Sequence, residues 1–101
     1  MYIFVRKDFS LAQQIVQAAH VALEAGFRFE KPDSPTHIVL IGVPDESTLL
    51  VEHQRLELNG IECEIFHEPD DPINGWTALA TRPIYDKKER KLLNKHRLCC
   101  S

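Results

Sequence analysis

"YIFVRKDFSLAQQIVQAAHVALEAG", residues 2–26, decides the fold, because it predicts a β-strand followed directly by an amphipathic helix. Residues 2–7 form a short run with β-branched and aromatic side chains, a composition typical of a strand, and we expect this strand to be central. Asp8 and Ser10 are candidate caps for a helix over about residues 11–25. Gly26 stands where a left-handed residue would end that helix.

The predicted helix has one apolar arc and one histidine at its margin. On a wheel of about 100° per residue, the arc that should face the core consists of Leu11, Ile15, Ala18, Ala19 and Ala22. His20 lies between this arc and the polar side. It is either a surface residue paired with Glu24 four positions on, or a functional imidazole that needs a partner from elsewhere in the fold.

The rest of the chain continues the alternation of strands and helices. The apolar run of residues 37–43 predicts a parallel strand covered on both faces, and Pro44 and Asp45 open a helix that Asn59 and Gly60 close. Residues 61–68 and 76–84 read as strands joined by a short loop. Residues 85–98 are a helix candidate whose anchors are Leu92 and Leu93.

The predicted order β-α-β-α-β-β-α defines an α/β fold, a three-layer sandwich with a mixed sheet of about four strands and helices on both faces. Each β-α-β crossover should produce parallel neighbours, and the short last loop permits an antiparallel pair. A chain of 101 residues is sized for one domain. We assign it to residues 1–98, followed by a short tail over residues 99–101.

Composition and charge favour a cytoplasmic protein. The sequence lacks an apolar run of about 18 residues, which argues against a membrane span. Its three cysteines form no disulfide framework, which fits a reducing compartment. Residues 85–98 hold six Lys or Arg against two acidic residues, a local +4 that leaves −7 on the rest of a chain of net charge −3. A basic segment therefore follows an acidic body.

Functional groups should gather beyond the carboxyl ends of the parallel strands. Three stretches qualify, RKDFS, GVPDE and HEPDDPING, and the last contains Glu68 beside His67. A histidine held by a carboxylate can act as a general base. The histidines form no HExxH and the cysteines no CxxC, so we expect no metal. Motifs for nucleotide cofactors and for serine hydrolases are also absent.

Several of these segments resemble the type 2 peptidyl-tRNA hydrolases. The resemblance rests on VRKD after the first strand, QAAHVAL in the helix, PDESTLLVEHQRLELNGIECEIFHE in the middle, and WTALATRPI in the last strand. It covers about residues 2–84. It implies hydrolysis of the ester that joins a peptide to the terminal ribose of tRNA, without a metal or cofactor.

The same resemblance assigns residues to the site. The family's helix histidine and glutamine fall on His20 and Gln17, its last-strand threonine on Thr77, and its strand-end aspartate on Glu68. Glu68 or His20 would activate a water, and Thr77 would orient an oxygen of the ester. We assign Gln14, Lys7 and Asp8, together with Gln17, to the substrate-binding side. Residues 85–98 would contact tRNA phosphates.

The sequence departs from the family at two places, which leaves alternatives open. The family's lysine position falls on Gln14 or is deleted, although Lys7 could substitute. Asp70 and Asp71 add negative charge to the last loop, which would repel a tRNA backbone. A non-catalytic binding or regulatory relative with the same fold is one alternative, and hydrolysis of another small ester or amide is a second. The sequence leaves the oligomeric state open, with a homodimer as the commonest assembly of small soluble proteins.

Overall fold

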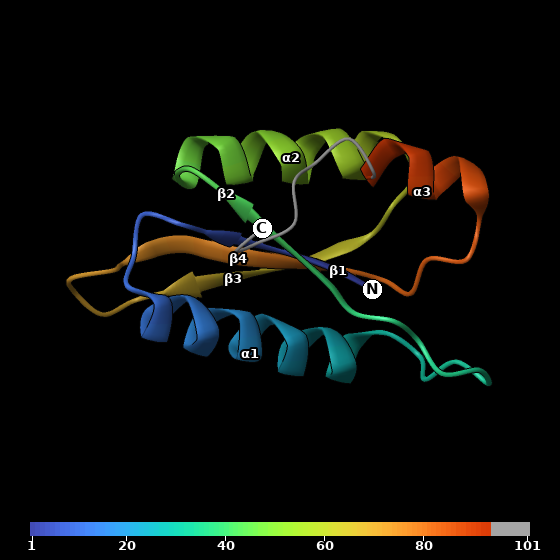
Figure 1. Cartoon of the computed structure of the whole chain (residues 1–101), viewed down its shortest axis with the longest axis horizontal. Helices are drawn as coiled ribbons and strands as arrows, with labels where there is room; N and C mark the ends of the chain where they lie inside the picture. The colour runs from blue at the N-terminus through green and yellow to red at the C-terminus, as the bar shows by residue number, and fades with distance from the viewer. Residues whose placement is uncertain (94–101) are drawn as a thin grey trace.

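The computed structural model describes residues 1–93 and contains four strands and three helices (Figure 1). In chain order these elements are β1 (Tyr2–Arg6), α1 (Leu11–Arg28), β2 (Val39–Val43), α2 (Glu46–Leu58), β3 (Cys63–Glu68), β4 (Gly75–Thr81) and α3 (Lys87–Leu93). The predicted element order is confirmed. Within residues 1–93, none of the helices is long and apolar enough to cross a membrane.

The strands form one mixed sheet in the order β2-β1-β4-β3. β1 is central, as predicted, and pairs in parallel with β2 and antiparallel with β4. The antiparallel pairing of β3 with β4 is also confirmed. The expectation that the second crossover makes neighbours is wrong, because β2 and β3 lie at opposite edges of the sheet. β1 and β4 lie between them, and β2 is an edge strand.

The sheet has helices on both faces, with α2 and α3 on one side and α1 on the other (Figure 1). We call the first the α2 side; its buried residues are Phe4, Ile41, Val43, Leu49, Leu56, Ile61, Cys63, Leu79, Ile84 and Leu93. On the α1 side the buried hydrophobic residues are fewer and smaller: Ile3, Val5, Val21, Ala25, Ala78 and Ala80. This three-layer α/β sandwich is the predicted fold class.

The α1 helix starts as predicted but ends later. Ser10 is its N-cap, and the Ser10 and Gln13 side chains each bond the other's backbone N–H in a capping box. The helix continues through Gly26 to Arg28, and the N–H of Phe29 donates to the carbonyl of Ala25. Gly26 therefore lies inside the helix and is no C-cap, a correction to the sequence prediction.

The predicted core face of α1 is only partly right, since Ala18 and Ala22 are partly buried against the core but the other three predicted residues are not. Leu11, Ile15 and Ala19 are exposed, and the residues buried against the sheet are Gln17, Val21 and Ala25. Relative to the prediction the helix is rotated by roughly a quarter turn about its axis, at about 100° per residue. A polar side chain thus occupies the inner face of α1, and large apolar side chains lie outside.

The α2 and α3 helices agree better with the sequence. Asp45 caps α2 by accepting from the N–H of Thr48 at 2.8 Å, and Gly60 follows the helix at φ +81°. Leu93 anchors α3 in the core, as predicted, with Leu92 partly buried beside it. The carbonyl of Leu92 accepts from Arg55, and Arg82 pairs with Glu89. The predicted helix over residues 94–98 and the tail with Cys99 and Cys100 lie outside the described residues.

Candidate active site

The three stretches expected beyond the strand ends do meet at one end of the sheet. Arg6 binds Asp8 through two hydrogen bonds, of 3.0 and 2.7 Å, and donates a longer one to the carbonyl of Trp76. The N–H of Trp76 donates to the Glu46 carboxylate at 2.7 Å. The stretches RKDFS and GVPDE are thus both hydrogen-bonded to the backbone of Trp76, at the start of β4.

A β-bulge in β4 orients the first site residue, Thr77. Trp76 pairs with His67 and Ala78 with Phe66, so Thr77 is the one extra residue of β4 at this point. Regular alternation would place Thr77 on the α2 side together with Leu79. Bulges reorient side chains, and the Thr77 hydroxyl instead donates to Gln17 of α1 at 2.6 Å.

Gln17 joins Thr77 to Glu68 in a chain of hydrogen bonds. Its amide oxygen accepts from the Thr77 hydroxyl, and its amide nitrogen donates to a Glu68 oxygen at 3.0 Å. Gln17 and Thr77 are both buried, with exposed fractions of 1% and 0%. An ionised carboxylate only accepts hydrogen bonds, so the donor at Glu68 fixes the orientation of the amide. The structure therefore brings together three of the predicted residues from α1, β3 and β4.

Glu68 presents a half-buried carboxylate at the end of β3. Its pKa is lowered chiefly by the hydrogen bond from Gln17 and next by the backbone N–H of Asp70, with His20 and His67 as minor electrostatic contributions. Burial acts in the opposite direction, with a smaller effect than the two hydrogen bonds. The group is held as an anion, which suits it to orient a donor or to stabilise a positive charge.

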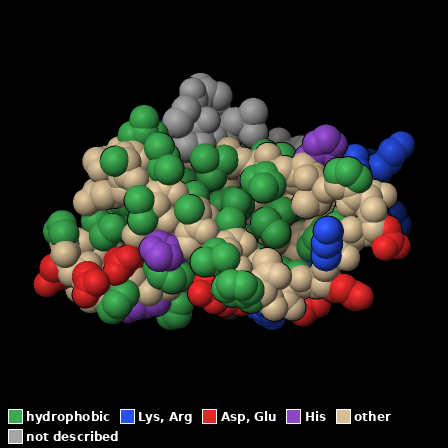
Figure 2. All heavy atoms as spheres, turned by 90° about the horizontal axis from the view of Figure 1, so that it is seen from below, with side chains coloured by type: hydrophobic (Ala, Val, Ile, Leu, Met, Phe, Trp, Pro, Cys, Tyr) green, Lys and Arg blue, Asp and Glu red, His purple; other side chains and the backbone are tan. Residues whose placement is uncertain are grey.

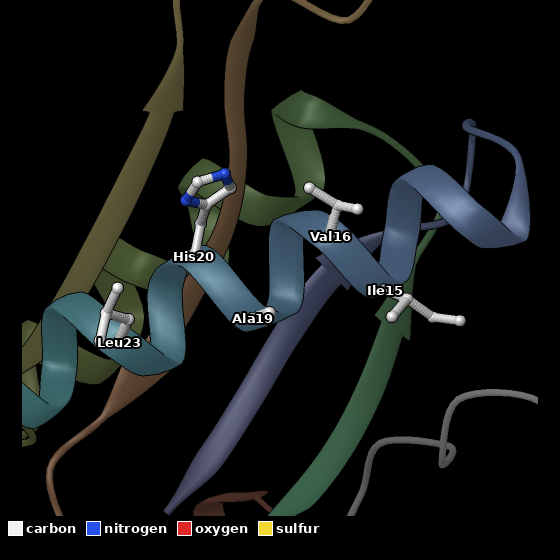
Figure 3. A pocket seen from close by; sticks show the side chains of 5 residues that line it. All are labelled: Ile15, Val16, Ala19, His20 and Leu23. Atoms are coloured by element: carbon white, nitrogen blue, oxygen red, sulfur yellow. The ribbon is translucent and has the colours of Figure 1, made fainter.

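His20 lies on the exposed edge of α1 nearest to β3, where its ring stacks on Phe66. The ring centroids are 4.8 Å apart and the planes differ by 4°. Phe66 precedes Glu68 by two residues, so both project to the α1 side of β3. Figure 3 shows His20 and Val16 pointing to the same side of α1, with Ala19 beside them. His20 and Glu68 thus share one side of the sheet and interact electrostatically.

The remaining predicted residues are more peripheral. Asp8 does not cap α1, because Ser10 does so and Asp8 binds Arg6. The methylene chain of Lys7 lies over the Cα of Gly42, where any larger residue would displace it. Gln14 donates to the carbonyl of Phe9 at 2.9 Å. The site that the described contacts define therefore consists of His20, Gln17, Thr77 and Glu68.

Two contributors were missed from the sequence. Phe66 provides the surface on which His20 stacks, and its position two residues before Glu68 was the available signal. Glu46 holds the backbone at the start of β4 through Trp76, next to Gly75 at φ +114°. A side chain at Gly75 would be strained and would meet the Glu46 carboxylate. Nothing local in the sequence indicated this second contact.

The described part of the basic segment lies at the other end of the sheet. β4 runs from Gly75 at the site to Thr81, and α3 follows beyond that end (Figure 1). Seven strand residues span about 23 Å. The lysines of α3 are thus well removed from Glu68, whereas Asp70 and Asp71 adjoin it in the loop after β3.

The arrangement provides an imidazole, an anion and an oriented amide beside an open surface. Among residues 1–93, no cluster of three or more His, Cys, Asp or Glu side chains could hold a metal ion. The chain matches no family model, and no curated protein matches its sequence.

Proposed function

We propose that this protein is a divergent relative of the type 2 peptidyl-tRNA hydrolases that hydrolyses the ester of peptidyl- or aminoacyl-tRNA. The observation that carries the proposal is the hydrogen-bonded chain from Thr77 through Gln17 to Glu68, beside His20. These are the four positions to which the resemblance assigns the chemistry, and they come from three separate elements. The reducing cytoplasm is the proposed compartment.

In this mechanism His20 is the general base. The oxygen of a water attacks the ester carbonyl carbon while the imidazole takes the proton of that water. The proton then passes to the ribose oxygen as the ester bond breaks, which releases the peptide acid and free tRNA. Glu68 is a weak base because its pKa is lowered, but as an anion it can orient the water and stabilise the imidazolium.

Gln17 and Thr77 are positioning residues in this scheme. Thr77 is completely buried and already donates to Gln17, so it acts by fixing the amide rather than by touching the ester. Gln17 in turn holds Glu68 in its ionised form. Loss of Gln17 removes the largest cause of the lowered Glu68 pKa. In Gln17→Leu we therefore expect the pKa of Glu68, followed by NMR of its carboxyl carbon, to rise toward the ordinary value.

The tRNA would contact two ends of the molecule. With its esterified terminus at Glu68, its backbone could reach α3, about 23 Å away along β4. The exposed side chains of Lys87, Lys88 and Lys91 are then the phosphate contacts. Replacing all three by Gln should weaken tRNA binding and reduce its salt dependence, with little effect on hydrolysis at saturating substrate.

The direct test is release of an N-acetylated amino acid from its tRNA. We expect His20→Ala and Glu68→Gln to lower kcat/KM by roughly 10²–10⁴-fold. The matched control is His53→Ala, because His53 lies on α2 and pairs with Glu57. Wild-type rates in both site variants would contradict the proposal.

A non-catalytic binding or regulatory relative is the second candidate, favoured by the charges around the site. Arg6 is engaged by Asp8 and Trp76, and Asp70 and Asp71 surround Glu68 with negative charge. No lysine occupies the family's position. Background rates from the folded wild-type protein, together with measurable tRNA binding, would support this candidate over the hydrolase. Self-association, which the sequence leaves open, is argued separately below.

A further inference from the structure

The outward face of α1 carries an unusual set of large apolar side chains. Five of them are between 51% and 76% exposed: Leu11, Ile15, Val16, Leu23 and Phe27. On the side from which α1 covers the sheet, hydrophobic side chains occupy the middle of the surface and charged ones lie mainly toward its margins (Figure 2). We call the five residues, with the small residues between them, the α1 outer face.

Small residues form the centre line of the α1 outer face. Ala12, Ala19 and Gly26 recur every seven residues, so they lie almost in line along the helix. From Leu11 round to Phe27 the face covers roughly 160° of the helix and contains no charged or hydrogen-bonding side chain. A helix face of this kind allows close approach of a second helix, whose axis could lie about 8–10 Å away.

The side of this face next to His20 is already shaped to receive a side chain. Val16, Ala19, His20 and Leu23, with Ile15, line a shallow hollow of about 330 Å³ (Figure 3). The first four are spaced i, i+3, i+4 and i+7, the spacing of the four residues that hold one inserted side chain in packed helices. Ala19 has the smallest side chain among these lining residues.

We propose that the α1 outer face binds the same face of a second copy of this chain, with the two α1 helices antiparallel. The pattern is symmetric about Ala19, since Ile15 and Leu23 lie four residues to either side and Leu11 and Phe27 lie eight. A twofold axis at Ala19 brings Ile15 against Leu23 of the second copy. It also brings Leu11 against Phe27 of that copy. Such self-complementarity is what an isologous dimer requires.

The available area is sufficient for this dimer. The line from Leu11 to Phe27 is about 24 Å long at 1.5 Å per residue. Five large side chains that are more than half exposed present on the order of 500 Å² per copy, or about 1,000 Å² in total, which is near the lower limit for a specific interface. Because the face bears no charge, a polyanion or a charged peptide would be a poor occupant.

The dimer meets the proposed active site only at His20, which also lines the hollow, and leaves Glu68, Gln17 and Thr77 outside the contact. Gln17 is on the opposite, buried side of α1, and His20 lies at the rim of the outer face with its ring on Phe66. Dimerisation therefore stands independently of the proposed hydrolysis. Its failure would not affect the assignment of Glu68, nor would the failure of hydrolysis affect the dimer.

Sedimentation equilibrium of the full chain over roughly 1–200 μM covers the usual range of dimer affinities. We expect the wild type to have the mass of two chains. Ile15→Glu should raise the dimer dissociation constant by at least about 100-fold, because it places two carboxylates in an apolar contact. The matched control is Val51→Glu, since Val51 is 62% exposed on α2 and Ile15 is 60% exposed on α1.

Ile15 is exposed in the single chain, so Ile15→Glu and Val51→Glu should show similar circular dichroism. A monomeric wild type across this range would overturn the proposal. So would an Ile15→Glu protein that remains as dimeric as Val51→Glu, because self-association would then use another surface. Either result would leave the α1 outer face for a different occupant.

A cross-link tests the position of the twofold axis. Ala19→Cys, combined with Cys99→Ser and Cys100→Ser, places one accessible thiol per chain at the predicted axis, since Cys63 is buried. We expect a disulfide-linked dimer under mild oxidation, because helix axes about 9–10 Å apart bring facing Cα atoms within disulfide range. The same background with Val51→Cys should remain unlinked. Equal cross-linking of the two variants would contradict the proposed face.

Discussion

The two faces of the sheet bury different kinds of side chain. On the α2 side, Phe4, Leu49, Leu56 and Leu79 fill a core of large apolar groups. On the α1 side the core residues are small, and buried Gln17 bonds to Thr77 and Glu68. The α2 side therefore buries most of the large apolar side chains of the core. The α1 side uses its interior to hold a polar chain in place.

The largest expected effect is on the α2 side of the sheet. Leu79→Ala removes three carbons from a completely buried position and should lower the free energy of unfolding by about 2–5 kcal/mol. Val21→Ala on the α1 side removes two carbons and should lower the free energy of unfolding by about 1.5–2 kcal/mol, at about 0.8 kcal/mol for each buried carbon. Denaturant titration of both variants measures the difference. Equal losses would contradict the larger effect expected on the α2 side.

A smaller effect is expected from the polar chain on the α1 side. Gln17→Leu leaves the buried Thr77 hydroxyl without its acceptor and should cost about 1–3 kcal/mol. Adding Thr77→Val removes the stranded hydroxyl, so the double variant should be more stable than the sum of the single losses predicts. Strict additivity in this double-mutant cycle would show that the bond contributes nothing.

Acid titration compares a carboxylate from each side. The pKa of Asp45 is lowered by hydrogen bonds from the backbone and the hydroxyl of Thr48, and that of Glu68 mainly by Gln17. A lowered folded-state pKa stabilises the protein above the ordinary value, and this stability is lost as the pH falls through the lowered value. Asp45→Asn and Glu68→Gln should each flatten the decline in unfolding free energy below about pH 4.5. An unchanged slope in either variant would refute its contribution.

The smallest expected change concerns Cys63 on the α2 side. Burial is the main cause that raises the pKa of its thiol to about 12, and the Glu57 carboxylate adds to it. In a Cys99→Ser, Cys100→Ser chain, a thiol reagent such as DTNB should therefore not react at pH 8 until the protein is unfolded. Rapid labelling of the native chain would show that this core opens readily.

Local signals in the sequence predicted most of the fold. Ser10 before α1 and Asp45 before α2 mark helix starts through caps that involve only neighbouring residues. The run of residues 2–7 identified the central strand. The adjacency of β2 and β3 was predicted incorrectly, because the position of β4 between β1 and β3 depends on pairings that no local pattern records.

The candidate site was predicted only through the resemblance, and the orientation of α1 was predicted incorrectly. The apolar arc with Leu11 and Ile15 pointed outward because the helix is turned to bring Gln17 to its partners. Glu68 and Thr77 are 51 and 60 residues away from Gln17 along the chain. A helical wheel treats glutamine as exposed, since it cannot know that buried partners will satisfy the amide.

The single additional residue at Thr77 divides β4 into two parts that pair with β3 in different registers. From Ala78 onward β4 keeps the register in which its side chains pack in the core. The end next to Glu46 is shifted from that register by one residue. A change of length confined to that end can therefore remove the support of the Gln17 amide without shifting the pairing of the rest of β4. Evolution could tune or retire the chemistry of such a scaffold by one codon while preserving the architecture.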